Sequence, residues 1–155
     1  MTQTKRPRGL RNNNPLNIRR TKGASWIGLS SVQTDPQFCQ FVNLEYGFRA
    51  VFLLLKKYYY NHHLVTIRQW IDRWAPPTEN ETSKYADMVG KIVNYSVDRV
   101  IPPLREAPHL WLQIVLAMAI EENGMGTIHL DEALSAMKGF GYVINIGTKE
   151  KIENR

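Results

Sequence analysis

The sequence predicts a mainly α-helical domain of the α+β class with a small β element. Residues 110–126, LWLQIVLAMAIEENGMG, hold a single polar residue between Leu110 and Ile120, so a helix here is apolar on every side and belongs in the centre of a domain. Apolar residues recur at helical spacing in the preceding segments, whereas β-prone pieces are confined to 25–42 and 142–146. The chain of 155 residues is long enough to bury such a core. The expected organisation is a basic N-terminal arm, one domain and a polar tail: residues 1–10, 11–147 and 148–155.

The N-terminal part predicts a loop followed by an irregular β element. Residues 11–20, RNNNPLNIRR, combine three asparagines with a proline, which favours a shaped loop over a regular element. Residues 25–42, SWIGLSSVQTDPQFCQFV, mix short β-prone pieces with a Thr-Asp-Pro turn at 34–36. We interpret this segment as a small hairpin or an irregular β lobe.

Helical periodicity starts near Phe48, where apolar residues at i, i+3, i+4, i+7, i+10 and i+11 predict an amphipathic helix. Thr66 is suited to cap a second, short helix, which Pro76 and Pro77 stop. A polar loop, TENET at 78–82, leads to a third helix. The expected apolar stripe of that helix comprises Tyr85, Met88, Val89, Ile92 and Val93.

Two glutamates end the central helix. Pro108 suits its first turn and Gly124 its end, which places Glu121 and Glu122 in the last turn on different faces, so at most one of them lines a cleft. A carboxyl group there faces the negative end of the helix dipole and an apolar wall, and both favour its protonated form. The alternative is that the chain simply turns polar where it meets water. A short helix ending at Gly139 follows.

The net charge of +6 is concentrated at the N-terminus. The basic residues among the first 22 positions, which contain no acidic residue, are Lys5, Arg6, Arg8, Arg11, Arg19, Arg20 and Lys22. Such an arm attracts polyanions, including nucleic acid, teichoic acid, anionic lipid and the carboxylates of peptidoglycan stems. A solvated leader is the alternative.

Several classes of site have no support in the sequence. The longest apolar run is too short to span a bilayer, and no apolar signal core follows the basic N-terminus. The only cysteine, Cys39, excludes an internal disulfide, indicates synthesis in a reducing compartment and is expected to be a small core residue. The histidines lack partners at metal-ligand spacing, so we expect neither a metal site nor a cofactor.

Carboxylates remain as the candidates for chemistry. Glycoside cleavage needs one acid that stays protonated beside the bridging oxygen, often with a second carboxylate on the other side of the sugar. Glu122 or Glu121 meets the first requirement by position. The candidates for the second acid, each of which can equally be a helix cap or a solvated charge, are Asp35, Glu45, Glu79 and Glu81.

Two groups of residues resemble cell-wall enzymes. The segment ENGMG after an apolar helix ending in AMAI resembles the catalytic helix of the lysozyme-like superfamily, whose glutamate is the general acid; that match selects Glu122, two places before Gly124. A second match lies nearer the N-terminus and consists of NPLNIRR, then WIG at 26–28, then the two phenylalanines of FCQF. This order is similar to the N-x-F-G-I-K, W-x-G and F-x-x-Y motifs of autolysin-type glucosaminidases. In those enzymes this block follows the catalytic helix, whereas here it precedes it, which implies a circularly permuted order.

The chain also resembles a family of phage and prophage proteins, commonly labelled structural or virion proteins and grouped with the lysozyme-like fold. The segments that carry this resemblance are RGLRNNNPLNIRR, EYGFRA, DRWAPPTENETSKY and AIEENG. The resemblance covers residues 8–126. It implies attack on the cell wall or docking to it, with peptidoglycan glycan strands and other virion proteins as partners. The candidate substrate-binding residues are Asn17, Arg19, Trp26, Tyr85 and Glu79.

The resulting hypothesis is a phage or prophage peptidoglycan glycosidase, whether a muramidase, a glucosaminidase or a lytic transglycosylase. Glu122 is the expected general acid, with Asp35 or Glu45 as a second catalytic carboxylate; a lytic transglycosylase, in which the sugar's own hydroxyl attacks, needs only Glu122. The expected location is the host cytoplasm at synthesis and then the virion or the periplasm and cell wall. The alternatives are a virion structural or wall-binding protein without turnover, and a nucleic-acid-binding protein that uses the arm.

Overall fold

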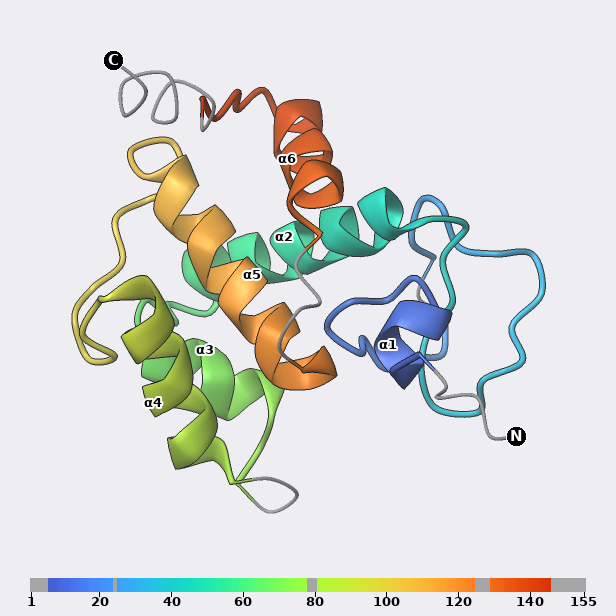
Figure 1. Ribbon diagram of the computed structural model, residues 1–155, viewed down its shortest axis with the longest axis horizontal. Coiled ribbons are helices and arrows are strands. Elements are labelled where there is room, and N and C mark those ends of the chain that lie inside the picture. Colours follow the sequence, from blue (N-terminus) through green and yellow to red (C-terminus); the bar gives the residue numbers. More distant parts are fainter. Residues whose placement is uncertain (1–5, 24, 78–80, 125–128, 146–155) are drawn as a thin grey trace.

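The computed structural model describes residues 6–23, 25–77, 81–124 and 129–145, and this part of the chain is mainly helical. The helices are α1 (Arg8–Arg11), α2 (Leu44–Asn61), α3 (Ile67–Trp74), α4 (Thr82–Val93), α5 (Pro108–Asn123) and α6 (Leu130–Gly139). Helix α5 lies in the middle, with α4 on one side and α2 and α6 on the other (Figure 1). The mainly α fold class predicted from the sequence is confirmed.

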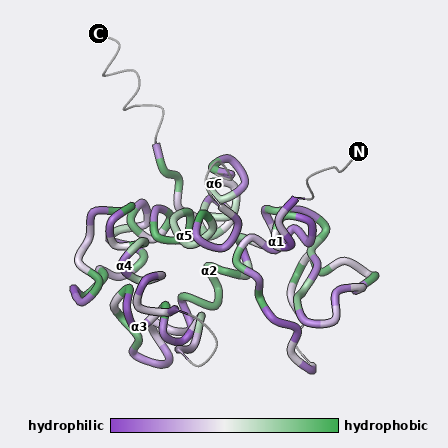
Figure 2. The backbone as a smooth tube through the Cα atoms, turned by 60° about the horizontal axis from the view of Figure 1, so that its bottom comes forward, coloured by the Kyte–Doolittle hydropathy of each residue, from purple (hydrophilic) through white to green (hydrophobic). Residues whose placement is uncertain are grey.

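The centre of the core is α5, as its apolar sequence predicts. Trp111, Ile114, Val115 and Met118 are fully buried, and the Trp111 ring meets the Trp70 ring of α3 edge to face with centroids 4.8 Å apart. The tube of Figure 2 shows hydrophobic residues gathered along α5 and the middle of α2. Burial on this scale makes α5 the element against which the others pack.

One side of α5 departs from the prediction that the helix is covered all round. Gln113 is exposed, and Leu116 and Ile120 are only half-buried; these three residues line a surface pocket together with Ile92 and Val93 of α4. On α4, Met88 is 46% and Ile92 is 42% exposed, so these two members of the predicted apolar stripe are not buried. Helix α4 turns the other half of that stripe toward α5, where Tyr85 and Val89 are buried.

The starts of α2 and α3 follow from capping. The Asn43 side chain accepts a hydrogen bond of 3.0 Å from the Tyr46 backbone N–H, so α2 begins at Leu44, a little before the predicted start. The predicted cap at Thr66 is confirmed, because its hydroxyl accepts from the Gln69 N–H at 3.1 Å.

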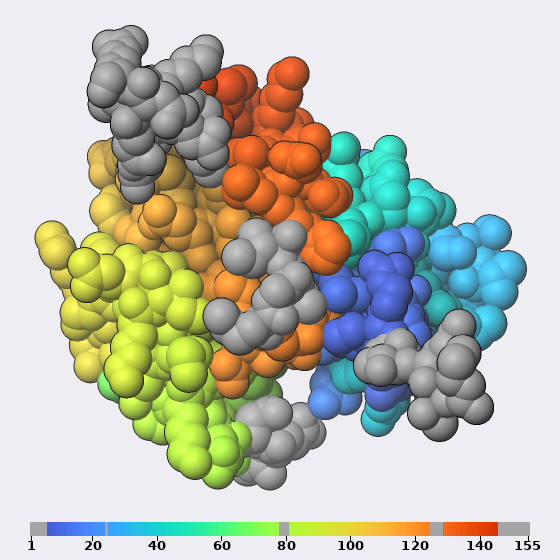
Figure 3. Space-filling view, viewed as in Figure 1, coloured from blue at the N-terminus to red at the C-terminus, as the bar shows by residue number. Residues whose placement is uncertain are grey.

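The N-terminal region is irregular and held together by polar side chains. Two isolated antiparallel bridges, between Arg19 and Phe38 and between Leu29 and Phe41, form the small β element. Gly9 and Leu10 are buried in α1, so residues 8–10, which were assigned to the arm, pack against the domain. Figure 3 shows α1 beside the C-terminal end of α5, and the two helices are in contact.

The C-terminal end of α6 corrects the strand predicted at 142–146. Gly141, at φ +91°, and Tyr142 donate backbone hydrogen bonds of 2.9 and 3.0 Å to the carbonyls of Lys138 and Met137, which closes the helix in a Schellman motif. Residues 142–145 form no strand, because no described segment pairs with them, and residue 146 lies outside the described ranges. Alternating apolar side chains alone do not make a strand.

Candidate functional site

Glu122, in the last turn of α5, is the centre of the candidate site. Its Oε1 accepts a hydrogen bond of 2.8 Å from Asn17 Nδ2, and its Oε2 accepts one of 2.9 Å from the Tyr85 hydroxyl. Glu122 is half-buried, whereas the adjacent Glu121 is exposed. Three residues that the sequence analysis singled out therefore meet at one carboxyl group, although they come from a loop, α4 and α5.

The amide of Asn123 fixes the end of α5 against the N-terminal loop. Asn123 Nδ2 donates to the Pro15 carbonyl at 2.6 Å and to the Ala119 carbonyl at 3.0 Å. This contact holds the loop that carries Asn17 beside the turn that carries Glu122. Asn123 was not among the predicted site residues; its position directly after Glu122 in the E-E-N-G sequence was the available signal.

The loop conformation explains why asparagines occupy it. Asn13 and Asn17 have φ of 52° and 53°, in the left-handed region that asparagine tolerates better than most residues. Asn14 is fully buried and donates from Nδ2 to the carbonyls of Ile18 and Cys39, both at 2.9 Å. The predicted shaped loop is confirmed, and its shape points the Asn17 amide at Glu122.

Gly9 allows α1 to sit close to these asparagines. A Cβ at this position would lie 2.6 Å from Asn123 Oδ1 and 2.8 Å from the Asn14 carbonyl oxygen, both of which are closer than real contacts allow. Any side chain here would push α1 away from α5. The close approach of α1 is therefore part of how the site is assembled.

Tyr85 reaches Glu122 from α4 and is buried. Its hydroxyl lies 2.9 Å from Glu122 Oε2 and 3.4 Å from the Met118 carbonyl oxygen. Burial raises the pKa of Tyr85 well above its usual range, and the neighbouring Glu122 carboxylate adds to this. Tyr85 therefore stays protonated, and its hydroxyl can donate either to the ionised Glu122 or to the Met118 carbonyl.

Burial raises the pKa of Glu122 above the usual range of a glutamate. The hydrogen bonds from Asn17 and Tyr85 stabilise the carboxylate and lower the pKa, while the charge of Glu121 raises it. The C-terminal end of the α5 dipole also disfavours the charged form. The net shift of the Glu122 pKa is toward the protonated form, which is the direction expected from its place in the sequence.

A surface pocket of about 230 Å³ lies directly beside Asn17. Its lining combines apolar, aromatic and cationic side chains, namely Asn17, Ile18, Arg19, Thr21, Trp26, Leu54, Tyr58, Arg73 and Trp74. The pocket thus collects three of the predicted substrate-binding residues. Trp74 and Arg73 were not predicted, because the periodicity of α3 indicated a core position for Trp74.

Comparison with known proteins places the chain in a phage family. No family model matches the sequence. Protein P5 of Pseudoalteromonas phage PM2 is 34% identical over 137 residues, which are 86% of this chain and 79% of that protein. The chain belongs to the P5 family. The phage relationship indicated by the sequence is thereby confirmed, and the name of the relative states no activity.

In this P5-family protein, Asp35 lies in a separate cluster and not at Glu122. Arg8 donates to its two carboxylate oxygens at 2.7 and 2.6 Å, and Asn12 donates to Oδ2 at 2.9 Å. The backbone N–H groups of Gln37 and Phe38 both donate to Oδ1 at 2.9 Å. The Arg8 guanidinium in particular holds the pKa of Asp35 far below its usual range.

Two of the other candidate acids, Glu45 and Glu81, are described, and neither contacts Glu122. Glu45 is exposed in the first turn of α2, where a carboxylate complements the helix dipole. Glu81 is exposed and lies 3.4 Å from Lys84 Nζ. Glu79 lies outside the described residues. Among the acids that the structure describes, Glu121 is the one that acts electrostatically on Glu122.

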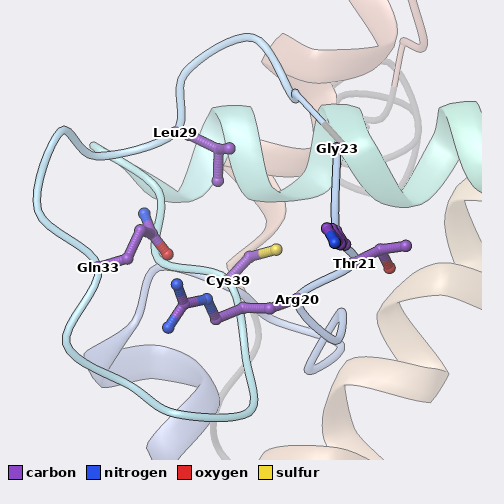
Figure 4. A pocket seen from close by; sticks show the side chains of 7 residues that line it. Arg20, Thr21, Gly23, Leu29, Gln33 and Cys39 are labelled. Carbon is purple, nitrogen blue, oxygen red and sulfur yellow. The ribbon is translucent and has the colours of Figure 1, made fainter.

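Cys39 lines a different pocket, of about 420 Å³, with Arg20, Thr21 and Leu29 (Figure 4). The thiol is buried, which raises its pKa and leaves it a poor nucleophile. No group of three or more His, Cys, Asp or Glu side chains suited to a metal ion occurs in the described ranges. Within the same ranges, no helix is long and apolar enough to cross a membrane.

Proposed function

We propose that this phage protein cleaves peptidoglycan glycan strands and that Glu122 is its general acid. The supporting observation is the environment of Glu122, a half-buried carboxyl group with a raised pKa, two neutral hydrogen-bond donors and a pocket beside one of them. A general acid must hold its proton near neutral pH and release it to a leaving oxygen. Burial raises the pKa of Glu122 in the direction that the first property requires, and the donors stabilise the carboxylate that forms.

The single-acid form of the reaction, that of a lytic transglycosylase, fits the described residues best. Glu122 gives its proton to the glycosidic oxygen as the bond from C1 to that oxygen breaks. The C6 hydroxyl of the same sugar then attacks C1, and its proton returns to the Glu122 carboxylate. The products are a 1,6-anhydro sugar and a free glycan end, and no water or second carboxylate takes part.

Tyr85 can adapt its hydrogen bonds to both states of Glu122. When Glu122 is ionised, the Tyr85 hydroxyl donates to Oε2 across 2.9 Å. When Glu122 is protonated, the hydroxyl can accept from it and donate to the Met118 carbonyl, 3.4 Å away. The Tyr85 hydroxyl therefore has a hydrogen-bond partner in both states of Glu122, so the carboxyl group can lose and regain its proton without leaving this hydroxyl unpaired.

The test is release of soluble muropeptides from purified peptidoglycan, with products identified by mass. We expect Glu122→Gln to lower the rate at least about 100-fold, because the general acid is removed. Glu121→Gln is the matched control, since it removes the neighbouring, exposed carboxylate. Anhydro ends would establish the transglycosylase reaction, whereas reducing ends would establish hydrolysis. Unchanged release by Glu122→Gln, or equal loss in Glu121→Gln, would refute the assignment.

A wall-binding phage protein without turnover is the second candidate. The observation that favours it is that both Glu122 oxygens already have partners, so the carboxyl group also ties the Asn17 loop and α4 to α5. This candidate predicts that the wild-type chain sediments with peptidoglycan and releases nothing. The same release assay therefore separates the two functions.

A further inference from the structure

The pocket beside Asn17 contains two cations on an aromatic and apolar lining. Its described lining includes Arg19 and Arg73 and no acidic side chain. Trp26, Tyr58 and Trp74 supply flat apolar surface, and all three are half-buried. A pocket with this composition favours a ligand that combines a ring face with a negative charge.

The positions of these side chains are fixed by contacts within the domain. Trp74 Nε1 donates to the Leu16 carbonyl at 3.0 Å, and the Trp74 and Tyr58 rings pack edge to face at 6.0 Å. The Arg73 guanidinium lies over the Tyr58 ring, 5.6 Å from its centroid. The pocket is therefore built jointly by α2, α3 and the loop that carries Asn17.

Asn17 joins the pocket to Glu122. Its side chain lines the pocket and its Nδ2 lies 2.8 Å from Glu122 Oε1. A saccharide whose scissile bond lies at Glu122 therefore has its neighbouring sugar or sugar substituent within reach of the pocket. Arg73 would face that substituent.

We propose that Arg73 binds a carboxylate carried by the glycan, so that the pocket selects acidic, peptide-bearing or lactyl-bearing strands over neutral polymers of N-acetylglucosamine. This inference rests on the proposed action on peptidoglycan and adds the determinant of its substrate choice. A guanidinium binds a carboxylate through two parallel hydrogen bonds, while the aromatic residues bind the apolar face of a sugar. Neutral chitin oligosaccharides offer the second contact and lack the first.

The test measures binding by tryptophan fluorescence, since Trp26 and Trp74 line the pocket. The protein carries Glu122→Gln so that the ligands are not consumed, and the probes are an N-acetylglucosaminyl-N-acetylmuramyl peptide and neutral chitotetraose. We expect Arg73→Gln to weaken binding of the acidic probe about tenfold and to leave chitotetraose nearly unchanged. Added salt should weaken only the acidic probe. Arg105→Gln, an exposed arginine outside the pocket lining, is the control.

The outcomes separate this inference from the proposed function. Equal affinity for the two probes, no effect of Arg73→Gln, or no binding of either probe would overturn the carboxylate pocket. If the wild-type chain releases muropeptides while Arg73→Gln binds both probes unchanged, the proposed function stands and the carboxylate pocket is refuted. If binding of the acidic probe depends on the pocket arginine but the wild-type chain releases no muropeptides, the carboxylate pocket stands and the protein binds the wall without cleaving it.

Discussion

Asp35 and Glu122 lie in two regions of the molecule that shift the pKa of a carboxyl group in opposite directions. Asp35 sits in the irregular N-terminal region, where the Arg8 guanidinium contacts both carboxylate oxygens. Glu122 sits at the end of the core helix, where its partners are the neutral amide of Asn17 and the hydroxyl of Tyr85. The pKa of Asp35 is lowered by its partner, and that of Glu122 is raised by its burial.

The comparison shows which features distinguish a structural carboxylate from a candidate acid. Both groups accept hydrogen bonds, so hydrogen bonding alone does not separate them. The separating feature is the charge of the partner, because a cation fixes the ionised form whereas neutral donors leave the proton balance to burial. Asp35 fastens the N-terminal loops together, and Glu122 remains able to exchange a proton.

The largest effect on stability is expected for Asp35→Ala. The substitution leaves Arg8, Asn12 and two backbone N–H groups without their acceptor, and the Asp35 side chain is only 9% exposed. We expect a loss of about 3 kcal/mol in the free energy of unfolding, which lowers the melting temperature by roughly 10 °C. Thermal unfolding followed by circular dichroism measures it. Glu45→Ala is the control, and an equally small change in both variants would contradict the structural role of Asp35.

The helical part of this comparison could be predicted from the sequence. The apolar run of α5, bounded by Pro108 and Gly124, indicated both the core helix and the placement of Glu122 in its last turn. The cap at Thr66 was predicted from local chemistry alone. These features depend on residues a few positions apart, which is the range over which periodicity and capping act.

The long-range parts of the site could not be predicted in this way. Arg8 and Asp35 are 27 positions apart, and Asn17 and Glu122 are 105 apart, so no local pattern links them. Asn17 and Tyr85 were found through a resemblance to phage proteins. Arg73 lines the pocket because the end of α3 meets the Asn17 loop, where Trp74 bonds to the Leu16 carbonyl, and only the packing of the whole domain decides this contact.

A smaller effect is expected for Tyr85→Phe, which removes one donor from the ionised form of Glu122. Loss of that donor raises the pKa of Glu122 further, so the limb on which muropeptide release falls with rising pH should move to higher pH. The stability cost is about 1 kcal/mol. The measurement is the pH profile of release, with Tyr95→Phe, whose hydroxyl bonds to the Val100 carbonyl, as control. A limb that stays in place or moves to lower pH would contradict the proposed role of Tyr85.

The smallest effect concerns the dependence of stability on pH. Because the folded-state pKa of Glu122 lies above its unfolded value of about 4.3, ionisation of Glu122 destabilises the folded chain as pH rises from the unfolded through the folded pKa. Glu122→Gln lacks this loss, so the variant should gain stability relative to the wild type across that window and hold the gain at higher pH. Urea unfolding at a series of pH values measures the difference. A relative gain by the wild type over the same window would show that the donors outweigh burial.

The most direct measurement is a carbon-13 NMR titration of the side-chain carboxyl groups, assigned with Glu122→Gln and Asp35→Asn. The account predicts that Glu122 titrates above about 4.3, the ordinary value for glutamate, while Asp35 stays ionised well below the ordinary aspartate value of about 3.9. A Glu122 pKa at or below the ordinary value would contradict its assignment as a general acid, whatever the Asp35 cluster does.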